Sequence, residues 1–237
     1  MKKYFKFLCF ASILIMISCS KENSFIDTND ASDTRTSYID FDFEKTVQGI
    51  TNPTVRSASP RNLILLENAT QRFWETVVYS NDSLQSIIKC GKDINISDRV
   101  YSGFIKQIND GNNFIRKTKE EGKVIILGLY NKNEFIKTRG SSYFGYNSTR
   151  PDYDTWTFNA NQVINVTYSN SNILPAPFKV DVNHLYGTQA IYLAPHSSTT
   201  RRYDVFTQTP VFWKFIFSAG TDDSNVVIGA NATWNNF

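Results

Sequence analysis

The sequence predicts an α+β fold, in which N-terminal helices pack on a mostly antiparallel β-sheet or β-sandwich. Between residues 59 and 122 the apolar residues recur at steps of three and four, which is typical of amphipathic helices. From Lys123 onward the period shortens to two, and turn residues interrupt short apolar runs, as in strands joined by loops. Helices followed by strands favour one globular domain over residues 38–237, helical over 59–122 and β-rich over 123–237.

The first element of this domain is expected at residues 39–44, where apolar and acidic residues alternate strictly. Period-two alternation predicts a half-buried strand that docks on the body. The alternative is an acidic-aromatic stretch that belongs to a preceding tether.

A helix is expected to begin at Ser59 and Pro60, which supply an N-cap and a first-turn proline. Its apolar face consists of Leu63, Leu66, Ala69, Phe73 and Val77. Asn81-Asp82 is interpreted as a break and a new cap, followed by a short helix with Leu84, Ile87 and Ile88 on one face and Gly91 at its end.

A further helix is expected to start at Ser97 or Asp98, because either side chain can accept a hydrogen bond from the first turn. Asp110-Gly111 is a weak point within it, and Gly122 is expected to end it. The helical part therefore contains two or three helices.

The β-rich part begins with a continuous apolar run over residues 124–130, which predicts a buried strand. A turn at 131–133 and a strand at 134–138 follow. Further strands are predicted at 155–158, 163–168, 178–182, 190–193, 203–207, 211–217 and 225–234.

The N-terminus has the parts of a secretory signal: a basic start, a short apolar run and a small residue before Cys19. The run is too short for a permanent membrane helix, which needs about 20 apolar residues. Met16-Ile17-Ser18-Cys19 resembles the lipobox of bacterial lipoproteins. The resemblance implies a signal peptide over 1–18 and a lipid on Cys19, with an ordinary secreted protein as the alternative.

The residues after Cys19 indicate in which membrane, and on which of its faces, a lipoprotein of this kind would be anchored. Ser20 stands where an Asp would favour retention in the inner membrane, so the resemblance implies the outer membrane. Ser20-Lys21-Glu22 is similar to the surface-export signal of Bacteroidota lipoproteins, which implies the cell surface, with the periplasmic face as the alternative. Residues 19–37 are almost entirely polar and are expected to form a flexible tether.

Charge and cysteine content exclude some classes of function. The signal segment carries three lysines and no acid, so the mature chain has 22 basic and 22 acidic residues and no electrostatic footprint for nucleic acid. Cys90 has no second cysteine left to pair with, and it is interpreted as a small apolar residue at a helix end. The expected partners are the membrane, through the lipid, and a ligand of the body.

The densest candidate site is the segment 139–156, which is expected to be a long loop because two glycines and a proline interrupt it. Aromatic rings beside Asp and Arg suit sugar binding by stacking and hydrogen bonding, and they are also enriched at protein–protein contacts. The alternative is that the aromatic residues pack the loop onto the sheet. The candidate ligand-binding residues are Arg139, Tyr143, Tyr146, Arg150, Asp152, Tyr153 and Trp156.

Catalytic signals are weak. His184 and His196 are too far apart for a short-spaced zinc pair, so no metal site is predicted, and the absence of Walker and dinucleotide motifs predicts no cofactor. The pairs Asp152/Asp154 and Asp222/Asp223 could act in glycoside hydrolysis, but each lies in a turn-like context.

These observations predict an outer-membrane lipoprotein whose body is a non-catalytic binding protein for a glycan or a protein. The first alternative is a polysaccharide or peptide hydrolase that uses Asp and His groups. The second is a structural or membrane-active envelope protein, for which an exposed apolar hairpin around 211–217 would be the sign.

Overall fold

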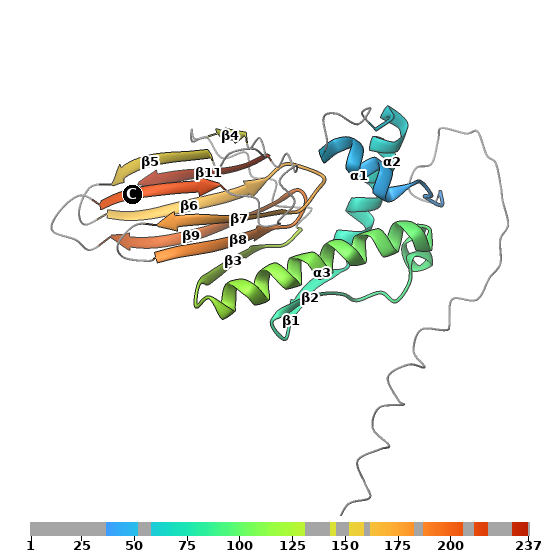
Figure 1. Cartoon of the computed structure of the whole chain (residues 1–237), viewed down its shortest axis with the longest axis horizontal. Helices are drawn as coiled ribbons and strands as arrows, with labels where there is room; N and C mark the ends of the chain where they lie inside the picture. The colour runs from blue at the N-terminus through green and yellow to red at the C-terminus, as the bar shows by residue number, and fades with distance from the viewer. Residues whose placement is uncertain are drawn as a thin grey trace, which may run out of the picture. The chain divides into compact units, whose positions relative to one another are not determined.

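The computed structural model describes residues 37–51, 58–130, 143–145, 152–158, 162–182, 187–205, 211–217 and 229–236. The signal peptide, Cys19 and all of the expected tether before Ser37 lie outside these residues. Within them the chain combines helices with two packed sheets, so the predicted α+β class is confirmed (Figure 1).

The helical part contains three α-helices, a β-hairpin and a short 3-10 helix. Their bounds are α1 Phe43–Thr51, α2 Pro60–Trp74, β1 Val77–Ser80, β2 Ser83–Ser86, η1 Gly91–Ile94 and α3 Asp98–Glu120. The strands that follow are β3 Val124–Gly128, β4 Tyr143–Gly145, β5 Asp152–Phe158, β6 Gln162–Asn170, β7 Ala176–Val182, β8 Gly187–Leu193, β9 Ser197–Val205, β10 Val211–Phe217 and β11 Gly229–Asn236.

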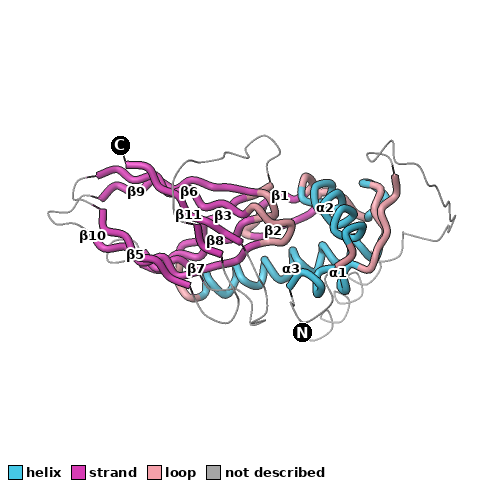
Figure 2. Tube along the Cα trace, turned by 90° about the horizontal axis from the view of Figure 1, so that it is seen from above, coloured by secondary structure: helices cyan, strands magenta, loops and turns pink. Residues whose placement is uncertain are grey.

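The strands form a five-stranded sheet in the order β3-β8-β7-β10-β5 and a four-stranded sheet in the order β4-β11-β6-β9. Every pairing in these two sheets is antiparallel except that of β3 with β8, which is parallel. The inner faces of the sheets meet where the ring of Tyr168 lies 6.4 Å from the ring of Phe178. The β-rich part is therefore a sandwich, and its two layers are visible in Figure 2.

The alternating segment at residues 39–44 docks on the body as predicted, but it is a strand only at its start. Ile39 donates to Asn95 O and accepts from Ser97 N, both at 2.8 Å, which forms a parallel bridge to Ile96. The buried positions are Ile39, Phe41 and Phe43. Asp42 then accepts from Lys45 N at 3.0 Å and begins α1, so helix replaces the predicted strand from Phe43 onward.

Helices α2 and α3 begin where their caps predict. Ser59 accepts from Asn62 N and Pro60 occupies the first turn of α2, while Ser97 accepts from Val100 N at the start of α3. Gly122, with φ of 70°, follows the end of α3. The Asp110-Gly111 weak point does not interrupt α3, which runs through 23 residues.

The prediction of a short helix after Asn81-Asp82 is wrong, because this segment is the β1–β2 hairpin. Asn81 and Asp82 have φ of 49° and 63°, the left-handed conformation that a two-residue type I′ turn requires at both positions. The helix-like spacing of Leu84 and Ile87 is coincidental, because Leu84 is buried whereas Ile87 is 68% exposed. Gly91 starts η1 instead of closing a helix.

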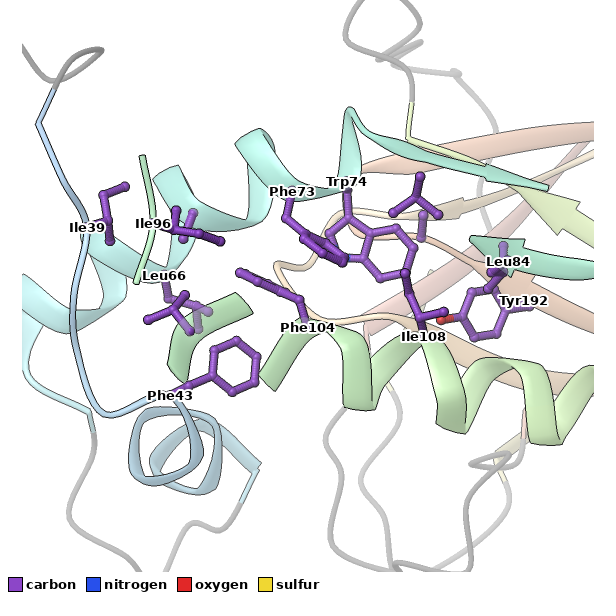
Figure 3. Close-up of a cluster of buried hydrophobic side chains, with 14 of the residues drawn as sticks. Ile39, Phe43, Leu66, Phe73, Trp74, Leu84, Ile96, Phe104, Ile108 and Tyr192 are labelled. Carbon is purple, nitrogen blue, oxygen red and sulfur yellow. The ribbon is translucent and has the colours of Figure 1, made fainter. Parts of the chain in front are cut away.

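Helix α3 packs against the other helices with its N-terminal half and against strand β8 with its C-terminal half. Its N-terminal half packs beside α1 and α2, where the rings of Phe73 and Phe104 stack with centroids 4.7 Å apart (Figure 3). Its C-terminal half reaches β8, where the rings of Phe114 and Tyr192 lie 6.5 Å apart. Gly103 and Gly111 lie where an aromatic ring comes against the helix: a Cβ at Gly103 would clash with the ring of Phe43, and one at Gly111 would lie 2.6 Å from Tyr192 Oη.

Strand β8 is buried on both faces. Ala190 and Tyr192 belong to the core shared with the helices. Gln189 instead accepts a hydrogen bond from Tyr203 of the opposite sheet, and by alternation Ile191 and Leu193 share that side. In contrast, β3 is less buried than its continuous apolar run predicts: it lies at the end of the sheet and Val124 is 44% exposed.

Candidate functional site

The structure divides the predicted 139–156 site between strands. Tyr143 lies in β4, while Asp152, Tyr153 and Trp156 lie in β5, so the prediction of one long loop is wrong for these positions. Strand β4 pairs with β11 and strand β5 pairs with β10. This pairing outweighs the local glycine and proline signals that favour a loop. Arg139, Tyr146 and Arg150 lie outside the described residues.

The two strands belong to different sheets. Trp156 is the register partner of Trp213 on β10, within the five-stranded sheet. Tyr143 is the register partner of Asn231 on β11, within the four-stranded sheet. The candidate residues of 139–156 are therefore not gathered into one backbone element, and only Tyr143 stands in the sheet that carries the polar surface described next.

The outer face of β6 is polar because the strand alternates strictly. Ile164, Val166 and Tyr168 are fully buried between the sheets. The residues between and after them, Asn165, Thr167 and Ser169, are partly exposed, as period-two alternation requires for a strand with one buried face, although the Oγ atom of Ser169 is itself buried.

Strand β9 extends this polar face, because residues that pair across an antiparallel ladder lie on the same side. Ser198 pairs with Ser169, Thr200 with Thr167, and Arg202 with Asn165. We call these six residues the polar ladder. The hydroxyls of Thr167 and Thr200 lie 2.8 Å apart, and Arg202 Nε donates to Asp204 Oδ1 at 2.9 Å.

The rows of the polar ladder continue in register across the sheet. On β11, Asn231, Thr233 and Asn235 are the backbone partners of Ser169, Thr167 and Asn165. The first row then continues to Tyr143 of β4. Every register position of these three rows, except Tyr143 and Arg202, is thus a Ser, Thr or Asn.

Buried tyrosines support the ladder from beneath. Tyr168 and Tyr203 are fully buried, their hydroxyl oxygens lie 3.0 Å apart, and Tyr203 donates to Gln189 Oε1 on the facing sheet at 2.5 Å. Burial, followed by the neighbouring Tyr203, raises the pKa of Tyr168 well above its ordinary value, so this hydroxyl stays protonated. Because these groups have hydrogen-bond partners, they join the two sheets without leaving a polar atom unsatisfied.

The polar ladder has the chemistry of a hydrogen-bonding surface. Hydroxyls both donate and accept, the amide of Asn165 does both through separate atoms, and Arg202 donates from a planar fork. Thr200 and Arg202 are exposed, and the strand geometry spaces the rows about 6.6 Å apart and the strands about 4.8 Å apart. Such a surface can bind a ligand that offers many hydroxyl groups along an extended face.

The residues of the hydrolase alternative are only partly described. His196 lies in the β8–β9 turn, where its Nε2 is 2.8 Å from Glu67 Oε1 on α2. Sequence reasoning missed Glu67, because only the fold brings α2 to this turn. His184 lies outside the described residues, and for Asp152 and Asp154 the structure describes the backbone positions in β5. In the described part of the chain, no three His, Cys, Asp or Glu side chains form a metal-binding group.

The strand named in the membrane-active alternative is an inner strand. β10 pairs with β5 through all seven of its residues, and on its other side Lys214 pairs with Asp181 of β7. The exposed apolar hairpin at 211–217 stays a prediction. Of the helices that the structure describes, none has the length and apolar character needed to cross a bilayer.

Comparison with known proteins adds no relative. No family model, no curated protein sequence and no solved structure matches this chain.

Proposed function

We propose that the protein is a lipid-anchored envelope protein that binds a glycan through the polar ladder and performs no chemistry on it. The observation that carries the proposal is the register of β6 and β9. It aligns Ser169 with Ser198, Thr167 with Thr200, and Asn165 with Arg202 on one sheet face, where Thr200 and Arg202 are exposed.

The composition of the ladder favours a glycan over a protein partner. Protein interfaces concentrate aromatic and other large side chains at their centre, whereas the ladder has small hydroxyl and amide side chains there. These groups match the alternating donors and acceptors of sugar hydroxyls.

Anchoring is the second part of the proposal, and its support is the lipobox-like Met16-Ile17-Ser18-Cys19. More than one acyl chain holds a protein stably on a membrane, whereas one chain gives only marginal binding. We place the protein at the outer membrane and facing the cell exterior, on the basis of Ser20-Lys21-Glu22. Replacing Cys19 by Ser should move the protein from the membrane fraction to the soluble fraction and abolish incorporation of labelled palmitate. Retention of the label would contradict this.

The binding proposal is tested on a glycan array with the mature chain, residues 19–237, carrying Cys19→Ser. We expect binding to one class of glycan and at least a tenfold loss of affinity, about 1.4 kcal/mol, in Thr200→Val and in Arg202→Ala. The matched control is Arg116→Ala, because Arg116 forms a comparable exposed pair with Glu120 at 2.8 Å on α3. Control and wild type should bind equally.

Two outcomes would overturn the proposal. One is glycan binding that Thr200→Val and Arg202→Ala leave unchanged, which would move the site elsewhere. The other is absence of glycan binding together with saturable binding to a single purified envelope protein, which would replace the glycan with a protein partner.

A further inference from the structure

The three rows of the polar ladder are not equally accessible. In the first row, that of Ser198 and Ser169, the Oγ atom of Ser169 is buried and is not open to a ligand. In the second row Thr200 is exposed, and in the third row Arg202 is exposed. A glycan on this face would therefore meet chiefly the second and third rows.

The second row repeats one residue type across three strands. Thr200 of β9 pairs with Thr167 of β6, and Thr167 pairs with Thr233 of β11. The hydroxyl oxygens of Thr200 and Thr167 lie 2.8 Å apart, so one of the two donates to the other. Because β-branched side chains are stiff at χ1, this pair is positioned before a ligand arrives, which lowers the entropy cost of binding.

A repeating row suits a ligand that repeats in the same direction. Neighbouring strands are about 4.8 Å apart, which is close to the length that one sugar ring occupies in an extended chain. The third row runs beside the second at a distance of about 6.6 Å, and there Asn165 pairs with Arg202. A chain that follows the second row would hold the hydroxyls of its other edge over these amide and guanidinium groups.

The charge on this side of β6 and β9 is balanced. Arg202 Nε lies 2.9 Å from Asp204 Oδ1, and the other outward residues of the two strands are uncharged. Arg201 lies on the opposite side of β9 by alternation. An anionic glycan would find no unpaired cation on the outward side and would meet the carboxylate of Asp204, so the charge balance favours uncharged sugars.

The placement of the ladder also distinguishes a polymer from a single sugar. Sites for small molecules are concave and surround most of the ligand, whereas the ladder is the outward side of a sheet. Weak contacts repeated along a surface add up only for a ligand that spans several of them. An internal stretch of a chain meets this condition, and a lone sugar or a chain end does not.

We infer that the polar ladder binds an uncharged, linear polysaccharide by an internal stretch of its chain. The chain runs across β9, β6 and β11 along the second row, with one edge over the third row. This assignment rests on the proposed function and names the class of glycan and its direction on the sheet.

The class is tested with the mature chain carrying Cys19→Ser. An array would present uncharged linear polysaccharides (β-glucan, xylan, mannan and amylose) beside anionic ones (polygalacturonate, alginate and hyaluronan). Oligosaccharides of one to six sugars, prepared from the polysaccharide that binds, would then be measured by isothermal titration calorimetry. We expect binding to an uncharged polymer, and affinity that rises at least about tenfold from one sugar to four.

The direction is tested at the two neighbours of Thr200, which are Thr167 across the sheet and Ser198 along the strand. Thr167→Val should weaken binding of the longest oligosaccharide at least about fivefold, whereas the matched control Ser198→Ala should change it less than about twofold. Asn165→Ala, in the third row, should also weaken binding. Circular dichroism of each variant should match that of the unsubstituted chain.

Three results would overturn this inference and leave glycan binding in place. They are preference for an anionic polysaccharide, a single sugar that binds as tightly as the longest oligosaccharide, and a loss in Ser198→Ala as large as that in Thr167→Val. Absence of binding to every glycan on the array would overturn the inference together with the proposed function.

Discussion

Strands β6 and β8 lie in opposite layers of the same sandwich, and they differ in how many of their faces are buried. β8 is covered by β6 and β9 on one face and by α3 on the other, and its residues from Gln189 to Leu193 are all buried. β6 buries Ile164, Val166 and Tyr168 and leaves a polar face outward. The difference shows that the position of a strand in the layers decides whether one of its faces is open to a ligand or both faces are buried in the core.

The comparison is tested most strongly at Ile191 of β8, which is fully buried on the side of the facing sheet. Ile191→Ala should lower the free energy of unfolding by about 2–5 kcal/mol, because it removes buried methyl groups and leaves a cavity. Urea denaturation would measure the change. A loss below about 0.5 kcal/mol would mean that β8 is not packed on both sides.

A smaller effect is expected at Gly111, which tests the helix side of β8. Gly111→Ala would push against Tyr192 and should cost about 1–3 kcal/mol by overpacking, although alanine normally stabilises helix interiors. Replacing Ser102, an exposed residue of the same helix, with alanine supplies the control for helix propensity and should be neutral or slightly stabilising. Equal effects of the two substitutions would show that Tyr192 does not contact the helix closely.

A pH-dependent effect is expected where the N-terminal segment joins the helices. Arg99 Nε and Nη2 donate to the two carboxylate oxygens of Asp40 at 2.7 and 3.0 Å. Burial alone would raise the pKa of Asp40, but hydrogen bonds from Arg99 and Ser97, together with the charge of Arg99, hold it below its ordinary value.

Because the folded-state pKa of Asp40 is lowered, its contribution to stability is present above about pH 4 and is lost as pH falls through the folded value. Both side chains are about half exposed, so the contribution should not exceed about 1 kcal/mol. Thermal unfolding of wild type and Asp40→Asn should differ at pH 7 and converge toward pH 2. A difference that persists at pH 2 would assign the effect to packing instead of charge.

The smallest stability effect is expected on the polar face of β6. Thr167→Val keeps the shape and β propensity of the side chain but removes a hydroxyl that lies 2.8 Å from that of Thr200. Stability should change by less than about 0.5 kcal/mol, as for most surface substitutions, while glycan binding falls. If stability fell by more than 2 kcal/mol, the ladder would belong to the packing of the sheet, and its contrast with β8 would disappear.

Local sequence signals predicted the elements whose causes are local. The caps at Ser59 and Ser97 and the exact strand 211–217 needed no distant partner to be recognised. The prediction was wrong for the β1–β2 hairpin, although Asn81-Asp82 lies between two short stretches, Val77–Ser80 and Ser83–Ser86, and both of its residues tolerate the positive φ of a hairpin turn. There the helical spacing of three apolar residues outweighed the turn chemistry.

The candidate site was harder to predict because it depends on register. A strand was predicted at 163–168, but nothing in that stretch indicates that Thr200 pairs with Thr167 or that Tyr143 belongs to the same row as Ser169. The predicted site at 139–156 grouped residues that are close in sequence. The sheets instead separate Tyr143 from Trp156.

By itself the sequence determined the α+β class, the starts of α2 and α3 and most strands of this protein, because capping, periodicity and turn chemistry act within a few residues. Only the tertiary structure decided that β8 is buried twice, that Gly111 admits Tyr192, and that hydroxyls from β6 and β9 form one surface. The physical reason is that pairing and close packing join residues far apart in the chain, and their energies depend on the partner that the fold supplies.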